Sequence, residues 1–257
     1  MCINFNFFIM NINDKTQVKK IYRGSFQYYQ ESTLYAEDTF EVFKDTKLQA
    51  FAFISNMHSR APSGELLQIS TYYEVNKNQI PVQVEIIKKL GNKNATESYT
   101  YDPVNSSLQY KFIGKKVTTE HSMNTNQKYH ITLPTALTST LFLGTKKFDT
   151  TSTNEFFFLV SNNQWIFKAP PTVRPVYVKK ISDTSENLTV NKNIVQTIRY
   201  ELSEINDWET KKGSKTLEEE KPVPPIEIFL SSHIAIPYIV KYNNTSIKIK
   251  QLNFMDE

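Results

Sequence analysis

Alternation of apolar and polar residues with a period of two runs through most of this chain, and no other feature constrains the fold as much. Residues 225–254 show it most plainly, as three short alternating segments separated by a polar stretch at residues 231–233 and by Asn243 and Asn244. Successive side chains of a strand point to opposite faces of a sheet, so this period indicates strands with one buried face. Because asparagine tolerates a positive φ, the asparagine pair suits a tight hairpin turn. These residues are predicted to form a three-stranded antiparallel meander.

The same pattern recurs upstream, with short polar connections between the alternating segments. The aromatic content of 13% fits strands, where broad side chains pack on a pleated surface. The predicted fold class is therefore all-β, an antiparallel meander that forms a strongly curved sheet, half-barrel or barrel-like domain. The other expected strands are residues 21–30, 39–44, 48–56, 66–75, 80–90, 96–101, 108–113, 117–122, 129–133, 155–160, 164–168, 173–181 and 194–202.

Residues 134–149 interrupt this alternation. Leu137, Leu141 and Phe142 lie there at helical spacing. A short helix or a capping loop is predicted, placed as a plug over one end of the sheet.

Three parts of the chain are distinguished by composition. Residues 1–19 are expected to be a flexible leader, and residues 20–257 a single all-β domain that could divide into two parts, 20–133 and 150–257. Residues 1–10 lack the basic start and the small-residue cleavage site of a secretory signal peptide, which favours the cytoplasm. Residues 208–225 combine Lys211, Lys212 and three consecutive glutamates with prolines, so a mobile, exposed loop is predicted.

The charge distribution argues against nucleic acid as a partner. The formal net charge is only +4, and the lysine doublets are scattered along the chain. Nucleic-acid binders usually gather basic residues on one face. The doublets, Lys88 with Lys89 among them, are interpreted as solvated residues near turns. No transmembrane segment is expected either, since no apolar run approaches the roughly 20 residues that a spanning helix needs.

No catalytic residue, metal site or cofactor is expected. The single cysteine, Cys2, excludes an intramolecular disulfide and a cysteine-based zinc site. Among the histidines, His58 and His233 lie near predicted turns. His121 and His130 fall on neighbouring predicted strands, but their places in the alternation point them to different faces. The sequence also lacks a nucleophile elbow, a zinc-binding helix motif and a phosphate loop.

Aromatic residues are the best candidates for a binding site. Residues 155–160 and 164–168 are predicted to form the most apolar hairpin of the chain, turning at Asn162 and Asn163. Either two faces pack into a filled sandwich or barrel, or a curved sheet leaves a concave apolar pocket. In the second case the ligand contacts would come from Phe142, Phe156, Phe158, Trp165 and Phe167.

One recurring unit carries a resemblance to known proteins. Ile80 and Pro81 open one predicted strand, and Ile236 and Pro237 open another, each followed by an asparagine-containing turn and a further strand. The repetition indicates either a duplicated unit or the tendency of proline to open edge strands. With the plug at residues 134–149, residues 226–252 resemble uncharacterised bacterial cell-envelope β-proteins of the lipoprotein-carrier type. That resemblance implies a half-barrel curled around a helical plug, and residence in the periplasm.

Three functions are compatible with these observations. The preferred hypothesis is non-catalytic binding of an apolar or amphipathic, lipid-like ligand in the concave face, in the service of envelope maintenance. The second is a scaffold that recruits a protein partner through edge strands or through residues 208–221. The third is an enzyme on a lipocalin-like barrel that uses His121 or His130 with a nearby carboxylate.

Overall fold

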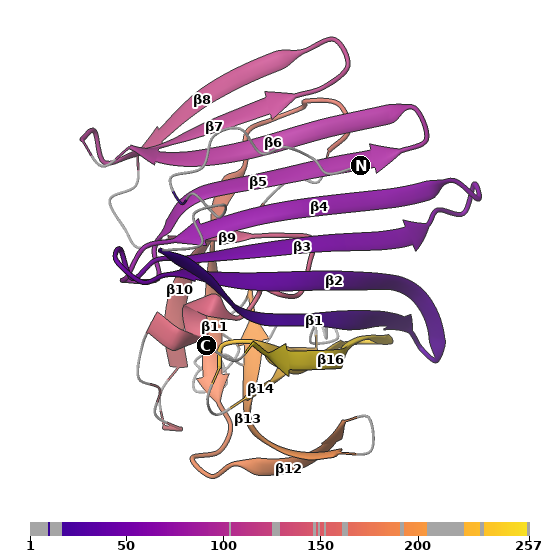
Figure 1. Ribbon diagram of the computed structural model, residues 1–257, viewed down its shortest axis with the longest axis vertical. Helices are drawn as coiled ribbons and strands as arrows, with labels where there is room; N and C mark the ends of the chain where they lie inside the picture. Colours follow the sequence, from indigo (N-terminus) through magenta and orange to yellow (C-terminus); the bar gives the residue numbers. More distant parts are fainter. Residues whose placement is uncertain are drawn as a thin grey trace, which may run out of the picture.

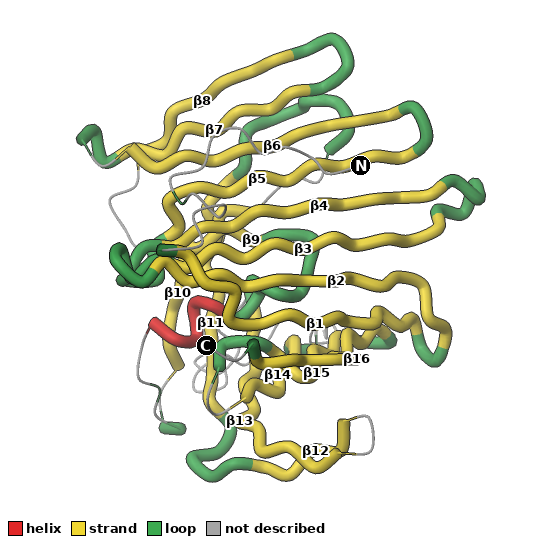
Figure 2. Tube along the Cα trace, in the orientation of Figure 1, coloured by secondary structure: helices red, strands yellow, loops and turns green. Residues whose placement is uncertain are grey.

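The structure is a computed structural model, and it describes residues 10, 17–102, 104–124, 129–145, 148, 150–151, 153–160, 164–190, 193–204, 224–231 and 234–255. In these residues sixteen strands join one sheet, and the only helix is the short 3₁₀ helix η1 (Leu141–Thr145). Figure 2 shows strand along nearly the whole trace, with η1 beside β10 and β11. The all-β prediction is confirmed.

The strands follow the chain as two successive runs. The first run is β1 (Val18–Gln30), β2 (Thr33–Asp45), β3 (Phe51–Arg60), β4 (Leu66–Val75), β5 (Pro81–Leu90), β6 (Lys93–Asp102), β7 (Ser107–Ile113) and β8 (Thr118–Asn124). The second run is β9 (Tyr129–Thr132), β10 (Thr153–Val160), β11 (Thr172–Lys180), β12 (Glu186–Val190), β13 (Asn193–Ser203), β14 (Ile226–Ser231), β15 (Pro237–Tyr242) and β16 (Thr245–Phe254).

Most strands pair with their chain neighbours, as a meander predicts. The order is β8-β7-β6-β5-β4-β3-β2-β1-β16-β15-β14-β13-β11-β10-β9, with β12 attached to β13. Of the described pairs, only β9 with β10 is parallel. Figure 1 shows β1–β8 as a stack of long strands across the view, whereas β10, β11 and β13 run steeply past them. The pairing of β1 with β16 joins the two runs into one sheet.

The two ends of the sheet pass each other instead of pairing, so the sheet is not closed into a barrel. β9, at one end of the order, lies inside the curve against β4 and β5: the Tyr129 hydroxyl donates to the Pro81 carbonyl at 3.3 Å, and the Ile131 N–H donates to the Tyr73 hydroxyl at 3.3 Å. Tyr129 and Ile131 belong to the same hydrophobic core as the inner residues of β2–β7. We call this rolled arrangement the open scroll.

The alternation explains the cores of the open scroll. Inward-facing residues such as Phe40 on β2, Tyr73 on β4 and Phe112 on β7 are buried, while their chain neighbours face outward. Apolar burial of this kind contributes about 1.5–3 kcal/mol for each large side chain. A second core gathers on the inner face of β10–β14, which is the concave side of the second run.

The predicted plug is confirmed, and the predicted turn at Asn243 is as well. Residues 134–143 are mostly buried, and η1 contributes Leu141, Phe142 and Leu143 to the interior. Asn243 has φ of 49° in the turn between β15 and β16, where asparagine tolerates the left-handed region.

Three expectations about local structure need correction. Residues 164–168 do not form a hairpin with β10, because β10 pairs with β11 and residues 164–170 cross the inner face as irregular chain. β12 lies between residues 181 and 194, where the sequence analysis predicted no strand. Pro81 and Pro237 do open strands, but β5 and β15 have partners on both sides and are not edges.

The predicted leader and charged loop fall largely outside the described residues. Of residues 1–19, Val18 already belongs to β1 and Met10 is fully buried, with its N–H 3.3 Å from Glu74 Oε2. Met10 and Val18 pack with Tyr72 in a small cluster on the outer face of β3 and β4. Residues 208–223 of the charged loop are not among the residues that the structure describes.

Candidate functional site

Three phenylalanines and a histidine form a buried cluster inside the second run of strands. The ring of Phe142 lies 4.9 Å from the ring of Phe156 and 4.9 Å from that of Phe158, in edge-to-face arrangements. His130 stands among them, with ring centroids 5.5 to 6.0 Å away. Edge-to-face contacts of this kind are favourable beyond the area they bury. We call these four residues the inner aromatic cluster.

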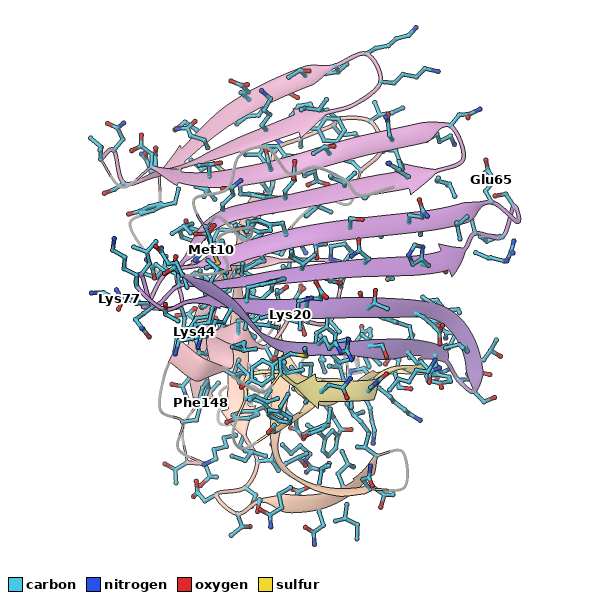
Figure 3. All side chains as sticks on the ribbon, viewed as in Figure 1. Met10, Lys20, Lys44, Glu65, Lys77 and Phe148 are labelled. Carbon is cyan, nitrogen blue, oxygen red and sulfur yellow. The ribbon has the colours of Figure 1, made fainter. Side chains whose placement is uncertain are left out.

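Phe148 extends the inner aromatic cluster toward the surface. Its ring stacks on Phe156 at 5.8 Å and meets Tyr200 edge-on at 5.3 Å. Figure 3 labels Phe148 next to η1, at the outer margin of the second run. The cluster therefore continues from the buried Phe142 to a half-buried ring.

Phe142 belongs to the plug, residues 134–145, and lies in η1. Two hydrogen bonds tie the first part of the plug to its surroundings: the Ala136 N–H donates to the Tyr28 hydroxyl at 2.9 Å, and the Thr140 hydroxyl donates to the Ala235 carbonyl at 2.8 Å. The Thr135 hydroxyl also lies 3.4 Å from that of Thr71. Within the described chain, η1 itself makes hydrogen bonds only to other plug residues. Its attachment to the strands is therefore apolar.

A buried carboxylate lies beneath the plug. Asp38, on the inner face of β2, is fully buried and accepts hydrogen bonds from Ser55 Oγ at 2.5 Å and from the Tyr28 hydroxyl at 3.2 Å. Burial raises the pKa of Asp38 to about 6, although both hydroxyls oppose the rise. Burial and the nearby Asp38 charge raise the pKa of Tyr28 well above its ordinary value, so the phenol keeps the proton that it donates.

A second polar group holds residues 164–170, which we call the strap, across the inner face of β5–β8. Lys88 Nζ lies 2.8 Å from Glu97 Oε1 and donates to the Gln164 carbonyl at 2.9 Å. The Lys88 and Glu97 side chains are 1% and 0% exposed. The expectation that Lys88 is a solvated turn residue is therefore wrong; Lys89 is the exposed member of the doublet.

The structure separates the five predicted ligand contacts into two groups. Phe142, Phe156 and Phe158 belong to the inner aromatic cluster. Trp165 and Phe167 lie on the strap instead, where Trp165 covers Lys88 Nζ at 5.8 Å and Phe167 stacks on His121 at 5.3 Å. Both strap residues are half-buried and fill the concave face of the first run.

The histidines do not form a metal site among the described residues. No group of three or more His, Cys, Asp or Glu side chains comes together there. His121 and His130 were expected on neighbouring strands, but β8 and β9 stand at opposite ends of the strand order. His58 is exposed, and His233 lies outside the described residues, as does Cys2.

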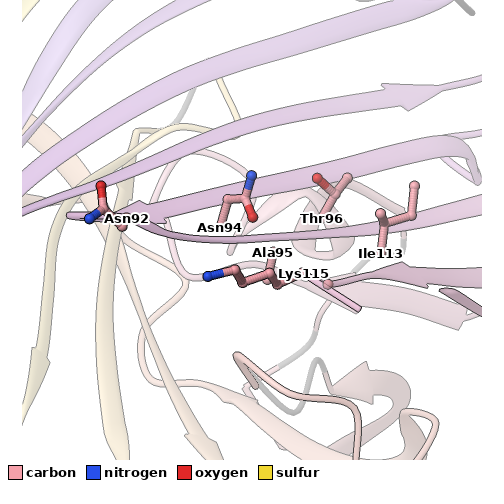
Figure 4. Close-up of a pocket in the computed structure, with 7 residues that line it drawn as sticks. Asn92, Asn94, Ala95, Thr96, Ile113 and Lys115 are labelled. Carbon is pink, nitrogen blue, oxygen red and sulfur yellow. The ribbon is translucent and has the colours of Figure 1, made fainter. Parts of the chain in front are cut away.

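A shallow cleft opens at the turns that connect β5 with β6 and β7 with β8. It measures about 370 Å³ and is lined by polar side chains including Asn92, Asn94 and Lys115, with Ile113 as an apolar contact. Figure 4 shows these side chains spread along the strand ends without converging on a common point. The cleft is separate from the inner aromatic cluster, whose members come from other strands.

The sequence contains a signal for the buried charges in the phase of the alternation. Asp38 is in phase with the inward-facing Ala36 and Phe40, and Lys88 is in phase with Val84 and Ile86. A charged residue in the apolar phase of a strand is predicted to be buried and therefore paired or hydrogen-bonded.

Comparison with known proteins identifies a fold and not a function. No protein-family profile matches the sequence, and no curated protein matches it significantly. A β-barrel-like protein from Brucella abortus with the domain of unknown function DUF1849 matches with a TM-score of 0.53 and 8% identity, over 92% of this chain and 98% of that chain. A DUF1089 family protein from Pseudomonas aeruginosa matches with a TM-score of 0.45 and 8% identity, over 74% and 83% of the two chains.

The fold is thus shared with an uncharacterised bacterial β-barrel-like protein, which is a broader finding than the lipoprotein-carrier type expected from the sequence. Among the described residues, none of the helical segments has the length and apolarity of a membrane-crossing helix.

Proposed function

We propose that this protein is a non-catalytic binding protein that takes an apolar or amphipathic, lipid-like ligand in place of its plug. The observation that carries the proposal is the attachment of η1. Among the described residues its hydrogen bonds stay within the plug, and Phe142 contacts the inner aromatic cluster through its ring. The plug then occupies the position that a ligand would take.

The plug and a ligand can exchange because the two would bury similar groups. Burying the Phe142 ring contributes about 1.5–3 kcal/mol, and an acyl or aryl group in the same place would recover that amount. A 3₁₀ helix of five residues adds little stability of its own. The Thr138 hydroxyl of the plug is buried without a hydrogen-bond partner among the described residues, which costs about 1–3 kcal/mol.

The inner aromatic cluster is buried while the plug is in place, so binding at this cluster requires the plug to move. Phe142, Phe156 and Phe158 are each at most 5% exposed. The role in envelope maintenance, with a lipid as the natural ligand, belongs to the same proposal. It is supported by the resemblance to lipoprotein-carrier-like proteins and by the fold shared with a bacterial β-barrel-like protein.

The test is binding of an uncharged apolar fluorophore, N-phenyl-1-naphthylamine, combined with native mass spectrometry of mildly purified protein. We expect saturable fluorescence enhancement, and tighter binding by Phe142→Ala because the internal competitor is shortened. If Phe142→Ala does not fold, Phe142→Leu replaces it in the binding measurement. Phe254→Ala is the control, since Phe254 is 63% exposed and far along the chain from the plug.

Absence of enhancement in the wild-type protein and in both Phe142 variants, with no co-purified lipid, would refute the proposal. So would a fluorophore affinity that changes equally in the Phe142 and Phe254 variants.

A second function is favoured by β8. This strand ends the sheet order and has a partner only on its β7 side among the described residues. An extended peptide could add to that edge by β-augmentation. Ser122→Pro should prevent a further strand from pairing with β8. A partner captured by the wild-type protein but not by this variant would support a scaffold function. Equal capture by both proteins would exclude this edge as the binding site.

A further inference from the structure

We infer that the ligand carries a cationic head group, an ammonium, that binds the carboxylate of Asp38. This inference rests on the proposed function, because it describes the polar end of the ligand that replaces the plug. It is carried by the contacts that the plug itself makes on the inner face.

The plug already has the layout of such an amphiphile. At one end, the Ala136 N–H donates to the Tyr28 hydroxyl, which in turn donates to Asp38 Oδ2. At the other end, Phe142 fills the inner aromatic cluster. Phe142 follows Ala136 by only six positions in the chain. A linear molecule with its tail in the cluster would therefore place its head next to Tyr28 and Asp38.

No cationic side chain pairs with Asp38 in the part of the chain that the structure describes. The side chains that donate hydrogen bonds to it are the hydroxyls of Ser55 at 2.5 Å and of Tyr28 at 3.2 Å, and the Asn56 backbone also donates to it. No ion pair among the described residues includes Asp38. Buried charges are normally paired, so this carboxylate is an unusual site.

The other buried charges of the inner face do not supply the missing cation. On β2–β7, the described residues place three buried charged side chains on that face, Asp38, Lys88 and Glu97. Lys88 is paired with Glu97 at 2.8 Å, so Asp38 is the uncompensated charge among these three described side chains. Because the pKa of Asp38 is about 6, that charge is present at neutral pH.

An ammonium suits this site better than the alternatives. It would form a charge-assisted hydrogen bond with the carboxylate, and the hydroxyl oxygens of Tyr28 and Ser55 offer further acceptors. A neutral hydroxyl head could donate to the same groups but would leave the charge in place. A carboxylate or phosphate head would be repelled by Asp38 at short range.

The test uses three ligands with the same ten-carbon tail: decylamine, decanol and decanoate, each below its aggregation concentration and each competing with N-phenyl-1-naphthylamine at pH 7.5. We expect decylamine to bind more tightly than decanol by about tenfold or more, as for a hydrogen bond to a charged group. Decanoate should bind most weakly.

Asp38→Asn isolates the charge, because the amide keeps the shape and an acceptor oxygen. In that variant decylamine should lose its advantage over decanol, while the affinity for decanol stays within about twofold. Glu37→Gln is the control, since Glu37 lies on the same strand with its side chain 50% exposed. It should leave all three affinities unchanged.

The outcomes separate the inference from the function on which it rests. If none of the three compounds displaces the fluorophore, and no fluorophore binds, the proposed function fails. If all three bind equally, if decanoate binds most tightly, or if decylamine keeps its advantage in Asp38→Asn, the cationic head group is refuted while apolar binding stands.

Discussion

At the residue scale, two buried carboxylates of the inner face stand in opposite electrostatic situations. Glu97 is paired with Lys88, and its second oxygen lies within 3.5 Å of the Tyr110 hydroxyl. Asp38 has only hydrogen-bond donors and no cation among the described residues. Removing one partner of a buried pair leaves an uncompensated charge, whereas removing an unpaired charge relieves a desolvation cost. Removing the charge of Lys88 is therefore expected to lower the free energy of unfolding, and removing the charge of Asp38 is expected to raise it at neutral pH.

Lys88→Met should lower the free energy of unfolding by about 3–5 kcal/mol, because it removes the cation that pairs with the buried Glu97 carboxylate. The double variant Lys88→Met/Glu97→Gln should recover much of the loss. Lys89→Met is the matched control and should change stability by at most about 0.5 kcal/mol, because Lys89 is exposed. Denaturant unfolding measures all three, and equal losses at positions 88 and 89 would contradict the burial of Lys88.

Asp38 should make stability depend on pH. Burial raises its pKa from 3.8 to about 6, so the folded protein holds this proton more tightly than the unfolded chain does. The stabilising contribution is complete below pH 3.8 and is lost as the pH rises through about 6. The rise corresponds to about 3 kcal/mol.

The stability of Asp38→Asn relative to wild type should accordingly increase by about 2–2.5 kcal/mol between pH 4 and pH 8. Denaturant titrations at the two pH values measure it. A difference that does not change with pH would show that Asp38 is not buried as an acid in the folded protein.

At the element scale, two irregular segments and one glycine determine how the strands enclose the interior. The plug covers the inner aromatic cluster, and the strap covers β5–β8. Gly24 lies on β1, where that strand pairs with both β2 and β16 and so joins the two runs. A Cβ atom there would lie 2.3 Å from the Gln251 carbonyl oxygen and 2.5 Å from the Phe40 ring. The close approach at this junction needs a residue without a side chain.

Gly24→Ala should therefore destabilise the protein by about 1–3 kcal/mol through overpacking. Gly144→Ala in η1 is the matched control, because nothing lies within 4 Å of its added Cβ. We expect the control to be neutral or slightly stabilising, since alanine is the better helix former. Thermal unfolding compares the two, and equal midpoints would contradict the tight contact at Gly24.

At the scale of the whole molecule, the open scroll makes the two runs of strands interdependent. β9 packs inside the curve of β4 and β5, and β16 pairs with β1. Neither run buries its inner face alone. A division into residues 20–133 and 150–257 would separate groups that share one core.

Unfolding should consequently occur in a single cooperative transition. The near-ultraviolet signal, which reports tertiary packing around aromatic rings, should change together with the far-ultraviolet signal of the strands. Leu159→Ala on β10 and Val84→Ala on β5 both alter the shared core and should shift the two signals equally. Two separate transitions, each sensitive to one variant, would contradict the shared core.

The period-two alternation by itself determined the strand content, most strand positions, the meander order and the existence of the plug, because these depend on local side-chain direction and chain-neighbour pairing. The inward direction of Asp38 and Lys88 was also local, since both are in phase with apolar neighbours. Only the tertiary structure decided that β9 passes inside the sheet and that the strap carries Trp165 and Phe167 away from Phe156. It also decided that Lys88 meets Glu97, whereas Asp38 meets no cation among the described residues. These depend on how a long sheet curves and which of its distant faces then touch, and a pattern of period two carries no information about that curvature.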